Sequence, residues 1–164
     1  MKDTVEILKI LEKNGPMYSH DKIAQMVAKS EEEVDKIIRG LEKENVIVGY
    51  KTMINWDMTD TELVDAVIEL RITPQRGEGY DKVAKRIYKY PQVKSLYLMS
   101  GAYDLCVIIE GSSMKEVALF VAQKLAPMES VISTATHFVL KKYKDDGLIF
   151  YDDDDKDTRQ VITL

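Results

Sequence analysis

Apolar residues in the first 45 positions recur at helical spacing in three short segments. This periodicity predicts one helix over residues 3–13, a second over 20–28 and a third over about 31–44. Ser30 and Glu33 have the spacing of a capping box, which marks the start of the third helix. The side chains expected inward on the second and third helices are Ile23, Ala24, Met26, Val27, Val34, Ile37, Ile38 and Leu41.

The third helix is followed by two short strand-like runs, 46–50 and 52–54, which predict a small hairpin. Three short helices with tight turns and a hairpin are typical of a winged helix-turn-helix, whose recognition helix enters the major groove of DNA. Helix-turn-helix geometry is also used for protein contacts. A small helical bundle for packing or dimerisation is therefore the alternative interpretation.

The charge of the third helix bears on that choice. Residues 30–45 hold three basic and six acidic side chains, which gives a net charge of −3. Carboxylates near the start of the helix are repelled by phosphate, although a carboxylate can accept a hydrogen bond from a cytosine amine. The acidic residues expected to face DNA are Glu31, Glu32 and Asp35, and the side chains expected to contact phosphate are Lys22, Lys29, Lys36, Arg39 and Lys51.

Strands and helices alternate in the second half of the chain, after a polar linker. Apolar residues at 66, 68, 70 and 72 predict a strand with one apolar face. The elements expected after it are a helix over 80–90, strands over 92–99 and 103–110, a helix over 114–125 and a strand over 131–140. This order, βαββαβ, predicts an α+β, ferredoxin-like domain with one antiparallel sheet and both helices on one face.

Helices on one face of such a sheet leave the other face uncovered. We expect Val67, Val107 and Ile109 to lie on that second face, where a monomer would expose them to water. Association of two copies is the economical way to bury such a surface, so the sequence predicts at least a dimer.

Three motifs, in this order, resemble those of the Lrp/AsnC family, the feast/famine transcription regulators. Leu41-Glu42-Lys43-Glu44-Asn45-Val46-Ile47 resembles the passage from recognition helix to wing. Ser100-Gly101-Ala102-Tyr103-Asp104-Leu105 resembles the Gly-any-Tyr-Asp hairpin signature, and Ser133-Thr134-Ala135-Thr136 resembles the Thr-any-Thr strand. The resemblance spans about residues 1–145. The acidic start of the third helix departs from the family, whose members more often carry small polar and basic residues there.

The resemblance implies a dimer formed by pairing the C-terminal sheets, with further assembly to tetramers or octamers. It also implies an amino-acid effector bound between subunits, with Gly101, Ala102, Tyr103, Asp104, Thr134 and Thr136 as candidate contacts. Asp104 is suited to an α-ammonium group and the threonines to a carboxylate. The alternative is structural: Asp104 caps a hairpin, and the threonines are ordinary strand residues.

The composition argues against several classes of protein, among them membrane proteins and disulfide-bonded proteins. The chain is 45% hydrophobic and 31% charged, with a net charge of −5, and its apolar runs are too short to cross a bilayer. A single cysteine, Cys106, suits a cytoplasmic protein without an internal disulfide. His20 and His137 have no cysteine at metal-binding spacing, and no nucleophile–base pair stands out. We therefore expect no metal, no cofactor and no enzymatic activity.

These expectations divide the chain into a DNA-binding domain (1–55), a linker (56–63), a ligand-sensing and dimerisation domain (64–144) and a tail with an acidic turn and a strand-like end (145–164). The resulting hypothesis is a regulator that binds double-stranded DNA and responds to an amino acid. The alternative is an oligomeric amino-acid-binding or assembly module with weak or lost DNA binding.

Overall fold

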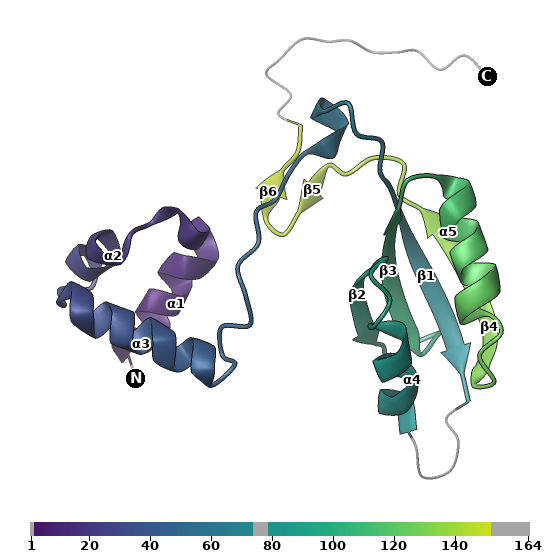
Figure 1. Ribbon diagram of the computed structural model, residues 1–164, viewed down its shortest axis with the longest axis horizontal. Coiled ribbons are helices and arrows are strands. Elements are labelled where there is room, and N and C mark those ends of the chain that lie inside the picture. The colour runs from purple at the N-terminus through teal and green to yellow at the C-terminus, as the bar shows by residue number, and fades with distance from the viewer. Residues whose placement is uncertain (1, 74–78, 152–164) are drawn as a thin grey trace. The chain divides into compact units, whose positions relative to one another are not determined.

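A computed structural model describes residues 2–73 and 79–151, and the chain divides into two compact units, Met1–Ile54 and Asn55–Leu164. The acidic turn expected at 152–157 and the strand-like end at 159–164 lie outside the described residues. Within the first unit the helices are α1 (Lys2–Asn14), α2 (His20–Met26) and α3 (Glu31–Lys43), with a 3₁₀ turn at Gly15–Met17 between α1 and α2 (Figure 1).

The three helices surround a small aliphatic core. Ile7, Ile23 and Val34, one from each helix, are completely buried, and Ala24 and Ile38 are nearly so. Full burial of one such aliphatic side chain contributes roughly 1.5–3 kcal/mol, so these few residues supply most of the driving force for this unit. The second helix was predicted to bury Met26 as well, which is wrong: its side chain is 51% exposed, because α2 ends there and Val27 packs against the core instead.

The predicted capping box is confirmed at the start of α3. The backbone amide of Glu33 donates to Ser30 Oγ (3.2 Å), while the backbone amide of Ser30 donates to the Glu33 carboxylate (2.9 Å). The helix ends where Asn45 adopts a left-handed φ of 55°, and the backbone amides of Val46 and Ile47 then donate to the carbonyl of Leu41. Backbone amides at the N-terminus of α3 and a backbone carbonyl near its C-terminus, which have no partner within the helix, thereby form hydrogen bonds.

The hairpin predicted for 46–54 is not present: these described residues form no strand. Val48 is 90% exposed, and only Ile47 packs against the helical core. An isolated two-stranded hairpin is at best marginally stable in water, and this segment has no apolar surface on which to dock both of its strand-like runs.

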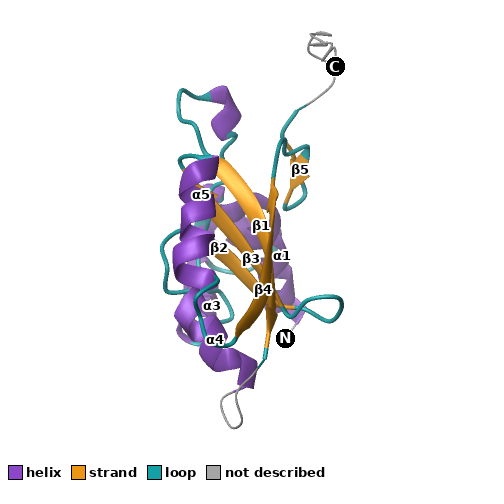
Figure 2. Ribbon diagram, turned by 90° about the vertical axis from the view of Figure 1, so that its right-hand side faces the viewer, coloured by secondary structure: helices purple, strands orange, loops and turns teal. Residues whose placement is uncertain are grey.

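The second unit confirms the predicted βαββαβ order and the α+β fold class. Its elements are β1 (Val64–Ile72), α4 (Gly79–Ile87), β2 (Val93–Leu98), β3 (Leu105–Gly111), α5 (Met114–Phe120), a π-helical turn at Val121–Leu125, and β4 (Val131–Phe138). They form an antiparallel sheet of order β2-β3-β1-β4. Figure 2 shows α4 and α5 on the same side of this sheet.

Strand register decides which residues face the helices. Ile68 of β1 lies opposite Val107 of β3, and Ala66 lies opposite Ile109. Directly opposed residues share a face of a sheet, so Val107 and Ile109 belong to the helix-covered core with Ala66 and Ile68, and all four are fully buried. The prediction that Val107 and Ile109 lie on the uncovered face is therefore wrong.

The helix-free face of the sheet carries the alternate residues. Its centre holds Val67, Ile108 and Cys106, of which only the cysteine is buried, at 8% exposure. Beside them, Tyr97 is 53% exposed, and His137 Nε2 lies 3.4 Å from a carboxylate oxygen of Glu69. The burial of Cys106 was expected. This face is partly apolar and partly polar, and neither α4 nor α5 covers it.

A short hairpin ends the described chain. Its strands are β5 (Lys144–Asp145) and β6 (Leu148–Ile149), joined through Gly147 at a left-handed φ of 81°. The acidic turn and strand-like end expected for residues 145–164 did not include this hairpin. A 3₁₀ turn at Trp56–Met58 begins the second unit in the part of the chain expected to be a linker.

Removal of the Ser30 cap tests the packing of α3. Ser30→Ala is expected to destabilise the first unit by about 1 kcal/mol, because it leaves the Glu33 amide without its acceptor. Hydrogen exchange of the α3 amides measures this, with Ser113→Ala, which removes the cap of α5, as a control that leaves α3 protected. Hydrogen bonds from Ser30 lower the pKa of the Glu33 carboxyl below its ordinary value. The stabilisation of the folded state by these bonds is therefore complete above the ordinary pKa of glutamate and is lost as the pH falls below that value.

Candidate nucleic-acid interface and effector loop

Helix α3 presents both basic and acidic side chains to solvent. Lys36 is exposed, and the side chain of Arg39 is 76% exposed. Glu31 and Glu32, the first two residues of the helix, are also exposed. The basic groups that could reach a phosphate backbone therefore share the helix with two unshielded carboxylates.

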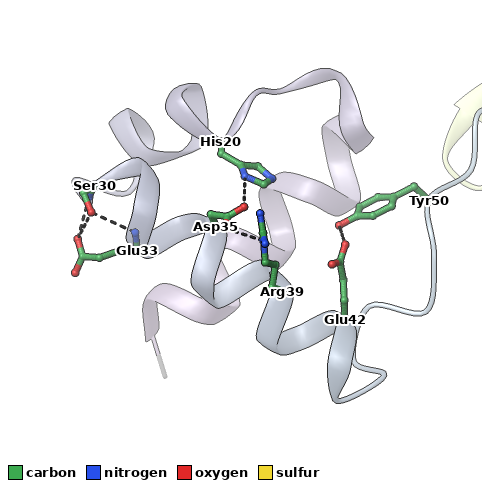
Figure 3. A network of polar contacts seen from close by, with 7 residues as sticks. All are labelled: His20, Ser30, Glu33, Asp35, Arg39, Glu42 and Tyr50. Carbon is green, nitrogen blue, oxygen red and sulfur yellow. Dashed lines mark hydrogen bonds and ion pairs between the residues drawn. The ribbon is translucent and has the colours of Figure 1, made fainter.

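Asp35 is held between two basic groups instead of standing free. Its Oδ2 lies 2.8 Å from Arg39 Nε, one helical turn along α3, and its Oδ1 lies 3.2 Å from His20 Nδ1 at the start of α2 (Figure 3). The carboxylate is thus shared across two helices. Asp35 thus forms an ion pair with Arg39 and also has the His20 ring as a neighbour.

Two further acidic residues of α3 have polar partners. Glu33 is engaged by Ser30, whose backbone amide and hydroxyl lower the pKa of this carboxyl. Glu42 accepts a hydrogen bond from the Tyr50 hydroxyl (3.0 Å), and burial together with this carboxylate raises the pKa of Tyr50 (Figure 3). Of the acidic side chains expected to face DNA, Glu31 and Glu32 remain exposed, whereas Asp35 is paired.

The other predicted phosphate contacts lie on different elements. Lys22, on α2, stacks over the ring of Tyr18 at 3.8 Å from its centroid. Lys29, in the turn before α3, forms an ion pair of 3.0 Å with Asp3 of α1, and this carboxylate raises the pKa of Lys29. Lys51 is exposed in the segment after α3. Lys36 and Arg39 are thus the predicted phosphate contacts that α3 itself carries.

In the second unit, Asp104 fixes the junction of three strands. Its carboxylate accepts hydrogen bonds from the Ile72 amide (2.8 Å) and from the Tyr80 hydroxyl (3.4 Å). Its own amide donates to the carbonyl of Leu70 (2.9 Å), and its carbonyl accepts from the amide of Met99 (2.8 Å). These contacts tie the start of β3 to the end of β1 and to α4. A carboxylate has about four lone-pair positions, and the described residues occupy two of those on Asp104.

The rest of the 101–104 loop lies beside Arg71. Arg71 Nε donates to the carbonyl of Ala102 (2.9 Å). Gly101 has a positive φ of 158°, at the limit of the extended region. Tyr103 is half-buried, and desolvation, with smaller contributions from Cys106 and Glu69, raises its pKa. Gly101, Ala102, Tyr103 and Asp104 therefore gather at the end of β1, together with Arg71 and Tyr80.

Thr134 and Thr136 lie on β4, on the other side of β1. Thr134 is opposite Leu70 and Thr136 is opposite Ile68, so both half-buried threonines face the helix-covered side at the sheet edge. β1 lies between β3 and β4, so Asp104 and the threonines lie on opposite sides of β1, with Leu70 between Asp104 and Thr134.

Sequence reasoning missed three participants: His20 beside Asp35, Tyr80 beside Asp104 and Arg71 beside Ala102. The spacing of Asp35 and Arg39 at i and i+4 does indicate their ion pair. The other partners come from different elements, and no local spacing indicates them.

Among the described residues, no group of three or more His, Cys, Asp and Glu could hold a metal ion, and no helix is long and apolar enough to cross a membrane. A cleft of about 330 Å³ lies between α4 and β2, lined by residues that include Tyr80, Tyr88, Lys94, Leu96 and Leu98. Tyr80 thus contributes both to this cleft and to the support of Asp104.

The Lrp/AsnC ligand binding domain matches residues 65–149 of the chain. The HTH-type transcriptional regulator YugG of Bacillus subtilis is 50% identical over 159 residues, which cover 96% of this chain and 95% of that protein. The leucine-responsive regulatory protein of Haemophilus influenzae is 23% identical over 140 residues, 85% of this chain and 83% of that protein. Both relatives are named as regulators of transcription.

The fold is shared with solved structures. The transcriptional regulator NMB0573 of Neisseria meningitidis, crystallised in complex with L-Met, has a TM-score of 0.70 at 23% identity, covering 88% of this chain and 92% of that one. The match of the ligand binding domain and the extensive identity with YugG assign the family: the chain belongs to the Lrp/AsnC family of HTH-type transcriptional regulators.

Proposed function

We propose that residues 1–55 form a helix-turn-helix domain that binds double-stranded DNA, with α3 as its recognition helix. The observation that carries this proposal is the exposure of Lys36 and Arg39 on α3, the third helix of a three-helix unit in a chain of the Lrp/AsnC family. Asp35 is paired with Arg39, Glu33 lies in the helix cap, and Glu42 accepts a hydrogen bond from Tyr50. These contacts fix where the carboxylates lie and leave the formal charge of −3 unchanged. Lys36 and Arg39 contact phosphate from α3, and Lys22, Lys29 and Lys51 add contacts from its flanks.

The second domain, residues 64–144, senses an amino acid. The L-Met complex of NMB0573 supports this class of ligand, and the loop at Gly101–Asp104 supports its place. The remaining acceptor capacity of Asp104 receives the α-ammonium group, while Thr134 and Thr136 serve the carboxylate. Because β1 separates these two sets within one chain, the site is completed between subunits.

Two copies associate through the helix-free face of the sheet, and dimers assemble further into tetramers or octamers. Support comes from Val67 and Ile108, which neither helix covers, and from the half-exposed Tyr97 beside them. Residues 56–63 link the domains, and 145–164 form a tail. DNA binding in a prokaryotic cell implies a cytoplasmic location, and both relatives named above are bacterial. This function requires neither a cofactor nor catalysis.

One observation favours a second candidate function. Glu31 and Glu32 stand exposed at the first turn of α3, where a recognition helix approaches base edges between two phosphate backbones. An amino-acid-binding or assembly module with weak or lost DNA binding accounts for them without any compensating contact. The two candidates differ in whether Lys36 and Arg39 matter for any activity.

The double variant Lys36→Ala, Arg39→Ala tests the DNA interface. Fluorescence anisotropy with DNA from upstream of the protein's own gene is expected to show a loss of specific affinity of at least about tenfold and a shallower salt dependence, because two phosphate contacts disappear. Lys9→Ala with Lys13→Ala removes the same charge from α1 and is expected to retain operator binding. Undiminished binding by the α3 variant would support the assembly module.

Thermal unfolding in each of the twenty amino acids at millimolar concentration, beginning with L-Met, tests the sensor. A ligand at a hundred times its Kd stabilises the native state by about 2.7 kcal/mol, so the effector is expected to raise the Tm. Asp104→Asn keeps a carbonyl for the Ile72 amide but removes the charge, and is expected to abolish the rise. Asp81→Asn, on exposed α4, should preserve it. A Tm unchanged by every amino acid would contradict amino-acid sensing.

Sedimentation of Val67→Asp tests the assembly. A carboxylate buried in an apolar interface without a partner is costly, so the variant is expected to sediment as a monomer, whereas the unaltered chain sediments as a dimer or larger. Val5→Asp makes the same change on the exposed side of α1 and should leave the assembly intact. Equal sedimentation of Val67→Asp and the unaltered protein would argue against the sheet face as the interface.

A further inference from the structure

The start of the second unit is fastened to the end of the described chain. Asn55 Nδ2 donates to the carbonyl of Phe150 (3.0 Å), across 95 residues of sequence, and the Tyr151 hydroxyl donates to the Asp57 carboxylate. The bond to Asp57 raises the pKa of Tyr151. We name this set of four residues, Asn55, Asp57, Phe150 and Tyr151, the clasp. It holds residues 55–57 against the β5–β6 hairpin.

The hairpin that carries the clasp is itself anchored to the sheet. Lys142 Nζ forms an ion pair with the Asp65 carboxylate at the start of β1, and the Val139 amide donates to the Asp65 carbonyl (2.9 Å). Phe150 closes the hairpin through a bond from its amide to the carbonyl of Tyr143 (3.0 Å). Residues 55–57 are therefore connected to β1 through the β5–β6 hairpin.

Asn55 destabilises the folded state more than most residues would in a segment that only connects two domains. Its side-chain Oδ1 is buried and, within the described part of the chain, has no hydrogen-bond partner. An unsatisfied buried acceptor is destabilising. A smaller or apolar residue would avoid that cost but would lose the Nδ2 donor to Phe150. The asparagine amide group at this position therefore serves to donate the hydrogen bond to Phe150.

The other end of the same connection is fastened to the DNA-binding unit. Tyr50, within the first unit, donates to Glu42 near the end of α3, and Ile47 packs on the helical core. Between Tyr50 and Asn55, only residues 51–54 remain as free chain, and they have no regular secondary structure. Four residues span five Cα–Cα steps, at most about 17 Å when extended.

Opening the clasp changes this length sharply. With the clasp open, the connection runs over residues 51–63 to Val64, the first residue of β1, and contains only the 3₁₀ turn at Trp56–Met58 as a regular element. Its length limit rises to roughly 45 Å. Each additional base pair between two half-sites displaces one of them by about 3.4 Å and rotates it about the duplex axis. A short tether lets the DNA-binding units reach few half-site spacings, whereas a long tether lets them reach many.

We propose that the clasp is a specificity device: by limiting the tether to residues 51–54, it restricts the spacings between operator half-sites that an assembled protein accepts. This inference rests on the proposed DNA-binding function and adds to it the residues that govern half-site geometry. Asn55 and Tyr151 are positioning residues, because they act through the tether and touch no DNA.

The test is a spacing series measured with the full-length chain. The operator selected by the unaltered protein is altered by insertions of 2, 5, 8 and 10 base pairs between its half-sites, and affinities are measured by fluorescence anisotropy, with a single half-site as reference. For the unaltered chain, an insertion of five base pairs is expected to weaken binding at least about tenfold, because effective concentration collapses when a tether cannot span its sites. For Asn55→Ala with Tyr151→Phe, affinities across the series are expected to fall within about threefold of one another, with unchanged single half-site affinity.

Two controls separate tether length from general damage. Tyr143→Phe removes the same hydroxyl from the same hairpin, at a side chain 70% exposed and outside the clasp, and is expected to keep the steep spacing profile. Asp57→Asn retains an acceptor for Tyr151 and is expected to keep it as well. The rate of chymotryptic cleavage after Trp56, followed by mass spectrometry, measures opening of the clasp in the absence of DNA. This rate should increase only in the double variant.

The outcomes distinguish this inference from the proposed function. Specific binding with an unchanged steep profile in the double variant, or unchanged cleavage after Trp56, overturns the clasp inference and leaves DNA binding intact. A flat profile in the unaltered chain does the same. Absence of specific binding by the unaltered chain overturns the proposed function, and the clasp inference with it.

Discussion

The one-sided covering of the four-stranded sheet is the constraint on which the second unit depends. Two helices between strands of a βαββαβ chain return to the same side, so the aliphatic side chains of β1 and β3 are buried there and the alternate ones are not. The face that neither helix covers has Val67 and Ile108 at its centre, and it is the surface that the proposed assembly would bury. The loop at Asp104 lies at the end of this same sheet.

The first unit solves an electrostatic problem within its own surface. Helix α3 needs acidic residues at its start for capping, yet DNA binding asks for positive charge on the same helix. Glu33, Asp35 and Glu42 each have a polar partner inside the unit. The ion pair with Asp35 also sets where the Arg39 guanidinium lies. The same few side chains therefore serve the stability of the unit and the placement of charge on its surface.

The sequence predicts the helices, the capping box and the βαββαβ order because each depends on local periodicity or spacing. It does not predict the facing of β3, because Leu105–Ile109 is an uninterrupted apolar run without alternation, and only pairing with β1 fixes its register. The expected hairpin at 46–54 fails for a tertiary reason, the lack of a surface to dock on. Among site residues, the Gly101–Asp104 loop was found by motif, whereas His20, Arg71 and Tyr80 join through three-dimensional proximity that no spacing encodes.

The strand order also dictates when each part of the protein can fold during synthesis. Central β1 pairs with β3 and β4, and β4 ends at Phe138. A chain leaving the ribosome therefore keeps one edge of β1 unpaired until β4 has been translated, near the end of the second unit. The three-helix unit, whose contacts are local in sequence, is complete long before that point. During translation the N-terminal unit can therefore fold first, and the sheet is completed last.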